Sequence, residues 1–389
     1  MNQDAPIVWA RVIGLYAVTL LVYSGFGVIQ PIFPVWAAQF SSSMTEIGMA
    51  TTLSAGVGLI GARPLAAWLM EGRHRSPTLA LGALVSAASA FVMPSLDTLG
   101  AVILARATQG LGFGLVATAA LAAVLDMAPA SRRGQLVGYF GASTALALFI
   151  GPLLGGLVAA RWSLDATFYV TGVLCLSGIS APFFIREASV GAARQGFSFA
   201  VVLEVPGLMR LTAIHFFGIL IHGVLLTYLP LRLEEHSGWV QADIFFGLEA
   251  GAVVLIRLFF GRRFDGLGRR VFLVLGLGSL SLAGVGLGLA QTDLELAMTA
   301  LVYGVGFGFY LPMIYATAGD IIPLAARVRG LAVVLLAFDL AVAGGGIALG
   351  PLADAAGPAA ALGWATIFPA FGCLLVVFGG SFRRVAASP

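Results

Sequence analysis

Three ionisable side chains interrupt long apolar stretches, and their chemistry suits the transfer of a proton. Glu249 and Asp339 supply carboxyl groups, and His222 supplies an imidazole. A charged group at membrane depth costs roughly 2.5 to 3.5 kcal/mol, so such groups face a protein interior or a watery cavity. Loss of water favours the neutral form of a carboxyl, and an imidazole changes its charge near neutral pH. We therefore predict that Glu249 and Asp339 take up and release a coupling proton and that His222 relays it.

Arg106 is a fourth ionisable residue inside an apolar stretch. We expect its guanidinium to bind an anionic group or to act on the two carboxyls. The alternative is that Arg106, Glu249 and Asp339 form a structural ion pair. For His222, the alternative is a hydrogen-bonded packing role.

Membrane-spanning helices are the elements that must position these groups. Hydrophobic residues make up 59% of the 389 residues and charged residues 10%, and the mean hydropathy is +0.99, which excludes an ordinary soluble protein. A helix that crosses a bilayer needs about 20 mostly apolar residues. This length predicts twelve spans, at approximately 11–37, 45–70, 77–94, 98–125, 136–160, 166–185, 208–233, 241–261, 270–290, 294–318, 328–350 and 358–381.

One longer polar connection separates the sixth predicted span from the seventh. It divides the chain into an N-terminal six-helix bundle over residues 1–185, a cytoplasmic linker over 186–206 and a C-terminal six-helix bundle over 207–389. We expect an all-α membrane protein with two pseudo-symmetric bundles.

The arginines give the orientation of the chain. All 21 basic residues are arginine, and an inward N terminus places sixteen of them at cytoplasmic span ends and only Arg161 and Arg232 at the opposite ends. This bias predicts both termini in the cytoplasm. It also explains the net charge of +3 without a nucleic-acid partner, because the basic residues do not gather on one face. The very short loops are typical of a bacterial inner-membrane protein.

Part of the chain is repeated. Glycines 110, 112 and 114, together with Asp126 and Pro129, reappear as glycines 304, 306 and 308, Asp320 and Pro323, each displaced by 194 residues. A constant displacement near half the chain length indicates two copies of one unit, an arrangement found in many transporters. In a bilayer these glycines would let neighbouring helices approach closely.

Three local motifs make the chain resemble the major facilitator superfamily. Residues 261–270, GRRFDGLGRR, are similar to the family's G-x-x-x-D-R-x-G-R-R loop except at Gly266, whereas the copy at 67–76 keeps only Glu71 and Arg75. The stretch RATQG at 106–110 resembles the fourth-span motif of proton-coupled drug exporters. The stretch GPLLGG at 151–156 resembles their fifth-span antiporter motif, and this group includes arabinose-efflux-like and multidrug exporters.

The resemblance implies a substrate cavity lined by spans one, four, seven and ten. Besides Arg106, it suggests substrate contacts from Tyr23, Gln30, Gln109, Tyr228, Tyr303 and Tyr310. With neighbouring phenylalanines such a lining suits an amphiphilic molecule. The alternative is that these aromatic residues only pack the helices.

The resemblance also suggests gating residues. The loop charges Glu71, Arg75, Asp265, Arg269 and Arg270, with Asp126 and Asp320 at the inner ends of spans four and ten, would form a cytoplasmic latch, although the arginines also serve as topology signals. Pro152 removes a backbone donor and would bend the fifth span, making Gly151 and Pro152 a hinge or a close-packing site.

These features favour a proton-coupled antiporter that exports a small organic or amphiphilic compound by alternating access. The alternative is an importer or facilitator of a sugar, organic anion or lipid-like solute. The sequence carries no HExxH site, GxSxG elbow or phosphate loop, so we expect no enzyme activity, cofactor or metal site. The expected partners are the substrate, protons and the lipid bilayer, and the expected state is a monomer.

Overall fold

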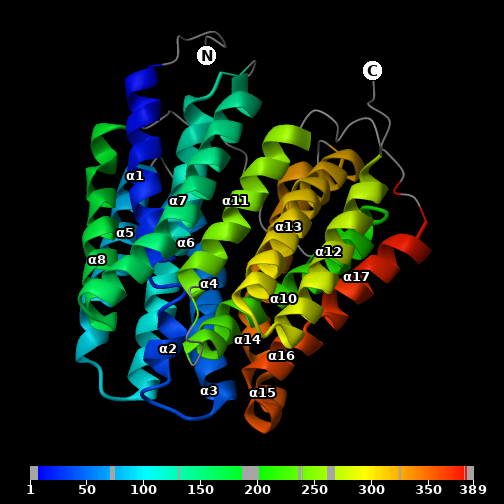
Figure 1. Cartoon of the computed structure of the whole chain (residues 1–389). Coiled ribbons are helices and arrows are strands. Elements are labelled where there is room, and N and C mark those ends of the chain that lie inside the picture. Colours follow the sequence, from blue (N-terminus) through cyan, green and yellow to red (C-terminus); the bar gives the residue numbers. More distant parts are fainter. Residues whose placement is uncertain are drawn as a thin grey trace. The chain divides into compact units, whose positions relative to one another are not determined.

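The computed structural model describes residues 8–70, 75–129, 132–185, 201–234, 238, 240–260, 268–323, 326–380 and 382. Every regular element within these ranges is a helix (Figure 1). The chain forms two compact units. Unit 1 comprises Met1–Ser42 and Met49–Ala192, and unit 2 comprises Ser43–Gly48 and Ala193–Pro389.

Unit 1 is built around α6, which packs against α4 and α5, and around α1, which packs against α7 and α8. The bounds of its helices are α1 (Trp9–Val28), α2 (Phe33–Ala37), the π-helical turn η1 (Met49–Leu53), α4 (Ser54–Leu69), α5 (Arg75–Val92), the 3₁₀ turn η2 (Met93–Ser95), α6 (Leu99–Met127), α7 (Arg133–Arg161), α8 (Leu164–Leu176) and the 3₁₀ segment η4 (Ser177–Phe183).

Unit 2 repeats this scheme, because α13 packs against α11 and α12, and α10 packs against α14 and α17. Its helices are α3 (Met44–Gly48), α9 (Val201–Glu204), α10 (Leu208–Glu234), α11 (Ala242–Phe260), α12 (Arg269–Leu289), α13 (Asp293–Ile321), α14 (Arg327–Ala348), α15 (Gly350–Ala356), α16 (Pro358–Trp364) and α17 (Ile367–Phe378).

Ten helical stretches of the described residues are long and apolar enough to cross a membrane. The two remaining predicted spans have identifiable physical reasons for falling short. The second span is broken into α3, η1 and α4, and the eighth, α11, carries Asp243, Glu249 and Arg257 within 19 residues. The chain is therefore an all-α membrane protein, as the sequence predicts.

The repeated glycines lie where helices touch. A Cβ on Gly110 of α6 would collide with the carbonyl oxygen of Ala55, and one on Gly304 of α13 would collide with that of Glu249, which is again displaced by 194 residues. Because each contact is to backbone, a side chain at either glycine would push two helices apart. This close approach holds Glu249 beside α13.

Candidate functional site

Arg106 is the largest charged side chain in the interior of unit 1. It lies on α6 and is 1% exposed. One guanidinium nitrogen, Nη1, donates a hydrogen bond of 2.6 Å to Oε1 of Gln109, one helical turn further along α6. The guanidinium carbon also lies 4.5 Å from the ring centroid of Phe33 and 5.2 Å from that of Phe26, so cation–π attraction holds it in an aromatic surrounding.

Two donors of this cluster remain unused. Nε of Arg106 and Nε2 of Gln109 are buried and have no hydrogen-bond partner in the structure. Within the described residues, no carboxylate forms an ion pair with Arg106. A buried donor without a partner costs about 1 to 3 kcal/mol, so the cluster is suited to a ligand that presents an acceptor or an anionic group.

Phe113 connects a second predicted residue to this cluster. Its ring stacks on that of Phe26 at 4.1 Å and meets that of Tyr23 edge-on at 4.7 Å. Tyr23, Arg106 and Gln109 therefore belong to one aromatic layer between α1 and α6. Gln30 is half-buried in the turn that follows α1.

In unit 2 the corresponding layer contains groups that can carry a proton. Nδ1 of His222 on α10 lies 3.0 Å from the hydroxyl of Tyr303 on α13. The imidazole also packs against the ring of Phe307 at 5.2 Å. Glu249 on α11 is 7% exposed and acts electrostatically on Tyr303. Tyr303 thus contacts a histidine and lies within electrostatic reach of a buried carboxyl.

The pairing of His222 with Tyr303 does not follow from the sequence, because the two residues are 81 positions apart. The repeat nevertheless contains a signal for it. Tyr303 is Gln109 displaced by 194 residues, and Phe307 is Phe113 displaced by the same number. The same repeated position is therefore occupied by Gln109, which binds Arg106, in unit 1 and by Tyr303, which binds His222, in unit 2.

Asp339 is 5% exposed on α14. The residue before it, Phe338, packs against the ring of His215 at 5.9 Å. Nδ1 of His215 lies 2.8 Å from the hydroxyl of Tyr310, and this hydroxyl also donates to the His215 carbonyl oxygen at 3.1 Å. The second histidine–tyrosine pair of unit 2 therefore contacts α14 through Phe338, the neighbour of Asp339 in the sequence.

Two of the tyrosines predicted to contact substrate use their hydroxyls between helices. Tyr310 joins α13 to α10 as described, and both it and Tyr228 have no exposed surface. The hydroxyl of Tyr228 donates to the carbonyl oxygen of Gly346 at 2.5 Å and to that of Met44 at 3.3 Å. In this structure both residues fasten helices of unit 2 together.

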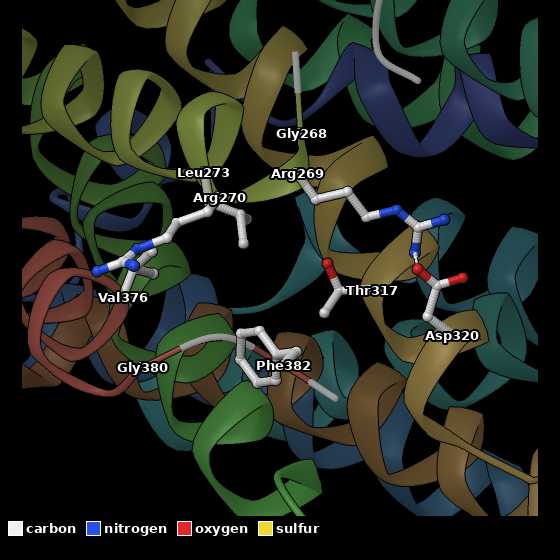
Figure 2. Close-up of a pocket in the computed structure, with 9 residues that line it drawn as sticks. All are labelled: Gly268, Arg269, Arg270, Leu273, Thr317, Asp320, Val376, Gly380 and Phe382. Carbon is white, nitrogen blue, oxygen red and sulfur yellow. Dashed lines mark ion pairs between the residues drawn. The ribbon is translucent and has the colours of Figure 1, made fainter. Parts of the chain in front are cut away.

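Among the described residues, predicted gating charges pair with each other in both units. Nε of Arg75, at the start of α5, lies 2.9 Å from Oδ2 of Asp126, at the end of α6. Arg269 at the start of α12 pairs with Asp320 near the end of α13, and both members of this pair are displaced by 194 residues (Figure 2). Each pair therefore ties a span to the next one within its own unit.

The other predicted gating residues differ in their surroundings. Arg270 donates a hydrogen bond to the carbonyl oxygen of Val377. Gly151 and Pro152 lie inside α7, and a Cβ on Gly151 would come within 2.8 Å of the Ser24 carbonyl oxygen of α1. Glu71 and Asp265 lie outside the described residues.

Asp354 has a structural role that its sequence position does not reveal. Its carboxylate accepts hydrogen bonds from the backbone nitrogen of Met44 at 2.5 Å, from Oγ1 of Thr45 at 2.6 Å and from Oγ of Ser43 at 3.3 Å. It therefore holds the beginning of α3. A single Asp in the apolar stretch 350–357 gives no indication of a partner about 310 residues away.

Known proteins with related sequences include a transporter and a drug-resistance protein. The uncharacterized MFS-type transporter YuxJ of Bacillus subtilis (strain 168) is 28% identical over 178 residues, which are 44% of each chain. The tetracycline resistance protein, class B, of Escherichia coli is 28% identical over 258 residues, 62% of each chain. The matches thus span less than two thirds of these relatives.

Solved structures show the same fold. A bacterial homolog to the human lysosomal transporter Spinster, in an inward-facing and unoccupied conformation, superposes with a TM-score of 0.80 at 14% identity, over 96% of this chain and 97% of the other. The nucleoside transporter NupG superposes with a TM-score of 0.75 at 13% identity, over 94% and 98% of the two chains. The model of the Major Facilitator Superfamily matches residues 15–346. The resemblance drawn from the motifs is confirmed: the chain belongs to the Major Facilitator Superfamily.

Proposed function

We propose that this transporter exports a small organic or amphiphilic compound from the cytoplasm in exchange for protons. The observation that carries the proposal is the buried Glu249 beside the hydrogen-bonded pair of His222 and Tyr303. Efflux proteins among the relatives support it, including the multidrug efflux protein YfmO of Bacillus subtilis, which is 28% identical over 241 residues.

Glu249 is the proposed proton carrier because its charge is poorly compensated. Among the described residues it forms no hydrogen bond or ion pair. A buried carboxylate without a partner is costly, whereas the neutral acid is tolerated. Proton uptake and release at Glu249 would therefore change the stability of any conformation that buries it, which is the requirement for coupling a proton gradient to a conformational change.

Arg106 is the proposed substrate-binding group of unit 1. Its unused Nε and the unused Nε2 of Gln109 offer two donors, and the rings of Phe26 and Phe33 offer apolar surface. A molecule with one hydrogen-bond acceptor group on an aromatic or aliphatic body would bind both the unused donors and the apolar rings. Asp339 remains the second proposed proton site, since it is also buried in unit 2.

Uptake of norfloxacin, a fluorescent aromatic compound that carries a carboxylate acceptor, into everted vesicles tests the proposal. We expect a pH gradient to drive uptake and a protonophore to abolish it. The variants Glu249→Gln and Asp339→Asn, made singly, should each lower gradient-driven uptake by tenfold or more if the residue carries the proton. Glu234→Gln is the matched control, because Glu234 is an exposed carboxyl at the end of α10.

Unaltered gradient-driven uptake in both carboxyl variants would contradict the proposed proton sites. Transport that is independent of a pH gradient and insensitive to the protonophore would instead favour the alternative of a facilitator or importer.

A further inference from the structure

A pocket of about 200 Å³ lies in unit 2 where α12 begins. Arg269 and Arg270 border it from α12, Thr317 from α13, and Phe382 from the chain beyond α17 (Figure 2). The two arginines extend to opposite sides of the opening, and Thr317 and Phe382 lie between them. The arginine bias assigns this end of unit 2 to the cytoplasmic side of the membrane.

The pocket has more positive than negative charge. Arg210 of α10 adds a third guanidinium, which stacks on the ring of Phe382 at 4.1 Å. Asp320 pairs with Arg269, but neither Arg210 nor Arg270 forms an ion pair within the described residues. The two are near enough to repel each other electrostatically. An anion between them would relieve this repulsion.

Unused hydrogen-bond donors of the two arginines also indicate that the pocket can bind an anion. Among the described residues, Nε of Arg210 is buried without a partner, and Arg270 donates a hydrogen bond to the backbone of Val377. Guanidinium groups present planar pairs of donors that match phosphate oxygens. A pocket of this volume has room for one phosphate group.

The arginine at position 270 has no counterpart at the equivalent position of unit 1. The pair of Arg269 and Asp320 has its counterpart in Arg75 and Asp126, but the residue that corresponds to Arg270, displaced by 194, is Ser76. The ion pair therefore belongs to the common scaffold of the two units. The additional arginine is not needed to build that scaffold.

The surroundings favour a lipid over a free ion. The apolar side chains of Leu273, Val376 and Phe382 form the remaining wall of the pocket. Next to it, Phe378 of α17 is 81% exposed and Leu275 of α12 is 48% exposed, and these helices cross the membrane. Basic pockets between helices on the cytoplasmic side are known to suit anionic headgroups. We propose that this pocket binds the phosphate of an anionic phospholipid, whose acyl chains lie along α12 and α17.

The test measures binding to the purified full-length protein, so it does not depend on the proposed transport activity. Native mass spectrometry in a non-ionic detergent would compare phosphatidylglycerol with phosphatidylcholine, and thermal denaturation would compare phosphatidylglycerol with inorganic phosphate. We expect phosphatidylglycerol to bind at least tenfold more tightly than phosphatidylcholine and to raise the melting temperature, with no such effect from inorganic phosphate.

Variants locate the site. Arg270→Ser, which installs the residue of unit 1, and Arg210→Gln should each weaken phosphatidylglycerol binding about tenfold, as expected for the loss of one charge-assisted contact. Arg270→Lys should lose less binding than Arg270→Ser, because it keeps the charge but not the planar pair of donors. Arg161→Gln is the control, since Arg161 is exposed in unit 1.

Three results would overturn the proposal. Equal binding of phosphatidylglycerol by the wild type, Arg270→Ser and Arg210→Gln would place any lipid elsewhere. Equal binding of the two lipids would indicate non-selective solvation. Equal protection by inorganic phosphate would indicate a free-anion site. If Arg270→Ser does not fold, the comparison of Arg270→Lys with Arg210→Gln still distinguishes the outcomes.

Discussion

At the scale of single residues, the two units place different chemistry at equivalent positions. Gln109 binds the guanidinium of Arg106 in unit 1, and Tyr303 binds the imidazole of His222 in unit 2. The first pair keeps a fixed positive charge in an aromatic surrounding. The second places an imidazole near the buried Glu249. We propose a division of labour in which unit 1 recognises a ligand group and unit 2 responds to protons.

The hydroxyl of Tyr303 is the group to remove first. Tyr303→Phe deletes the hydrogen bond to His222 but keeps the ring, so it should shift the pH profile of transport because the histidine loses the partner that couples it to Glu249. Tyr310→Phe is the matched control, since it removes the analogous bond to His215. We expect it to lower the thermal stability, by about 0.5 to 1.5 kcal/mol of unfolding free energy, with the pH profile unchanged. The measurement is the initial uptake rate of each variant between pH 6 and 8. Identical pH profiles of transport for the wild type and Tyr303→Phe would refute a proton relay through this tyrosine.

At the scale of helices, the close approach of α13 to α11 and α12 positions the site. Tyr303 and Phe307 stand on the same helix as Gly304, Gly306 and Gly308, which face neighbouring helices. Small residues at such contacts allow the backbones to touch, which is a main source of helix association in a bilayer. The placement of the tyrosine hydroxyl relative to Glu249 therefore depends on residues that carry no functional group.

Two glycines of α13 should respond in opposite ways to the same change. A Cβ on Gly306 would lie 2.9 Å from the backbone of α12, whereas one on Gly319 meets nothing within 4 Å. Gly306→Ala should therefore lower the melting temperature and the transport rate, because a helix must move. Gly319→Ala should leave transport intact and raise the stability by up to about 1 kcal/mol through helix propensity. Thermal denaturation in detergent measures the stability of both variants. Equal effects of the two changes on the melting temperature would contradict the assigned packing.

At the scale of the whole molecule, the repeat gives each unit the same ion pair between consecutive spans. Arg75 with Asp126 and Arg269 with Asp320 are partly exposed, so each pair contributes at most about 1 kcal/mol to stability. We propose that the two pairs, besides belonging to the common scaffold, have a common role in the transport cycle, because two spans that are tied together move as one body.

Charge reversal separates this role from a topology signal. Arg75→Gln should slow transport with little loss of thermal stability, and the double change Arg75→Asp with Asp126→Arg should restore part of the rate, because the attraction is rebuilt in the opposite sense. Arg132→Gln removes an exposed arginine from the same predicted side of the membrane and serves as the control for topology. Initial rates in everted vesicles provide the measurement. If Arg75→Gln and Arg132→Gln slow transport equally, the effect is one of topology and not of pairing.

The fold was predictable because its signals are local or periodic. Apolar length gave the spans, and the displacement of 194 residues gave the two copies. The break in the second span was not predictable, because the apolar run around Met49–Leu53 carries no proline or charge that would mark a π-helical turn. The partners of His222, His215 and Asp354 likewise depend on residues about 80 to 310 positions away. Such pairings arise only once the helices are packed.

The division of the second span between the units has a mechanical consequence. Helix α3 is held in unit 2 by Asp354, whereas α4 belongs to unit 1, and only the five residues of η1 connect them. A π-helical turn is wider than an α-helical turn, and its hydrogen bonds are less regular. We therefore expect η1 to be the segment of the second span that deforms most easily. Span eight, by contrast, lies entirely within unit 2. A rotation between the units would therefore act on η1 as well as on the other chain crossings between them, and span eight contains no equivalent element to share that torsion.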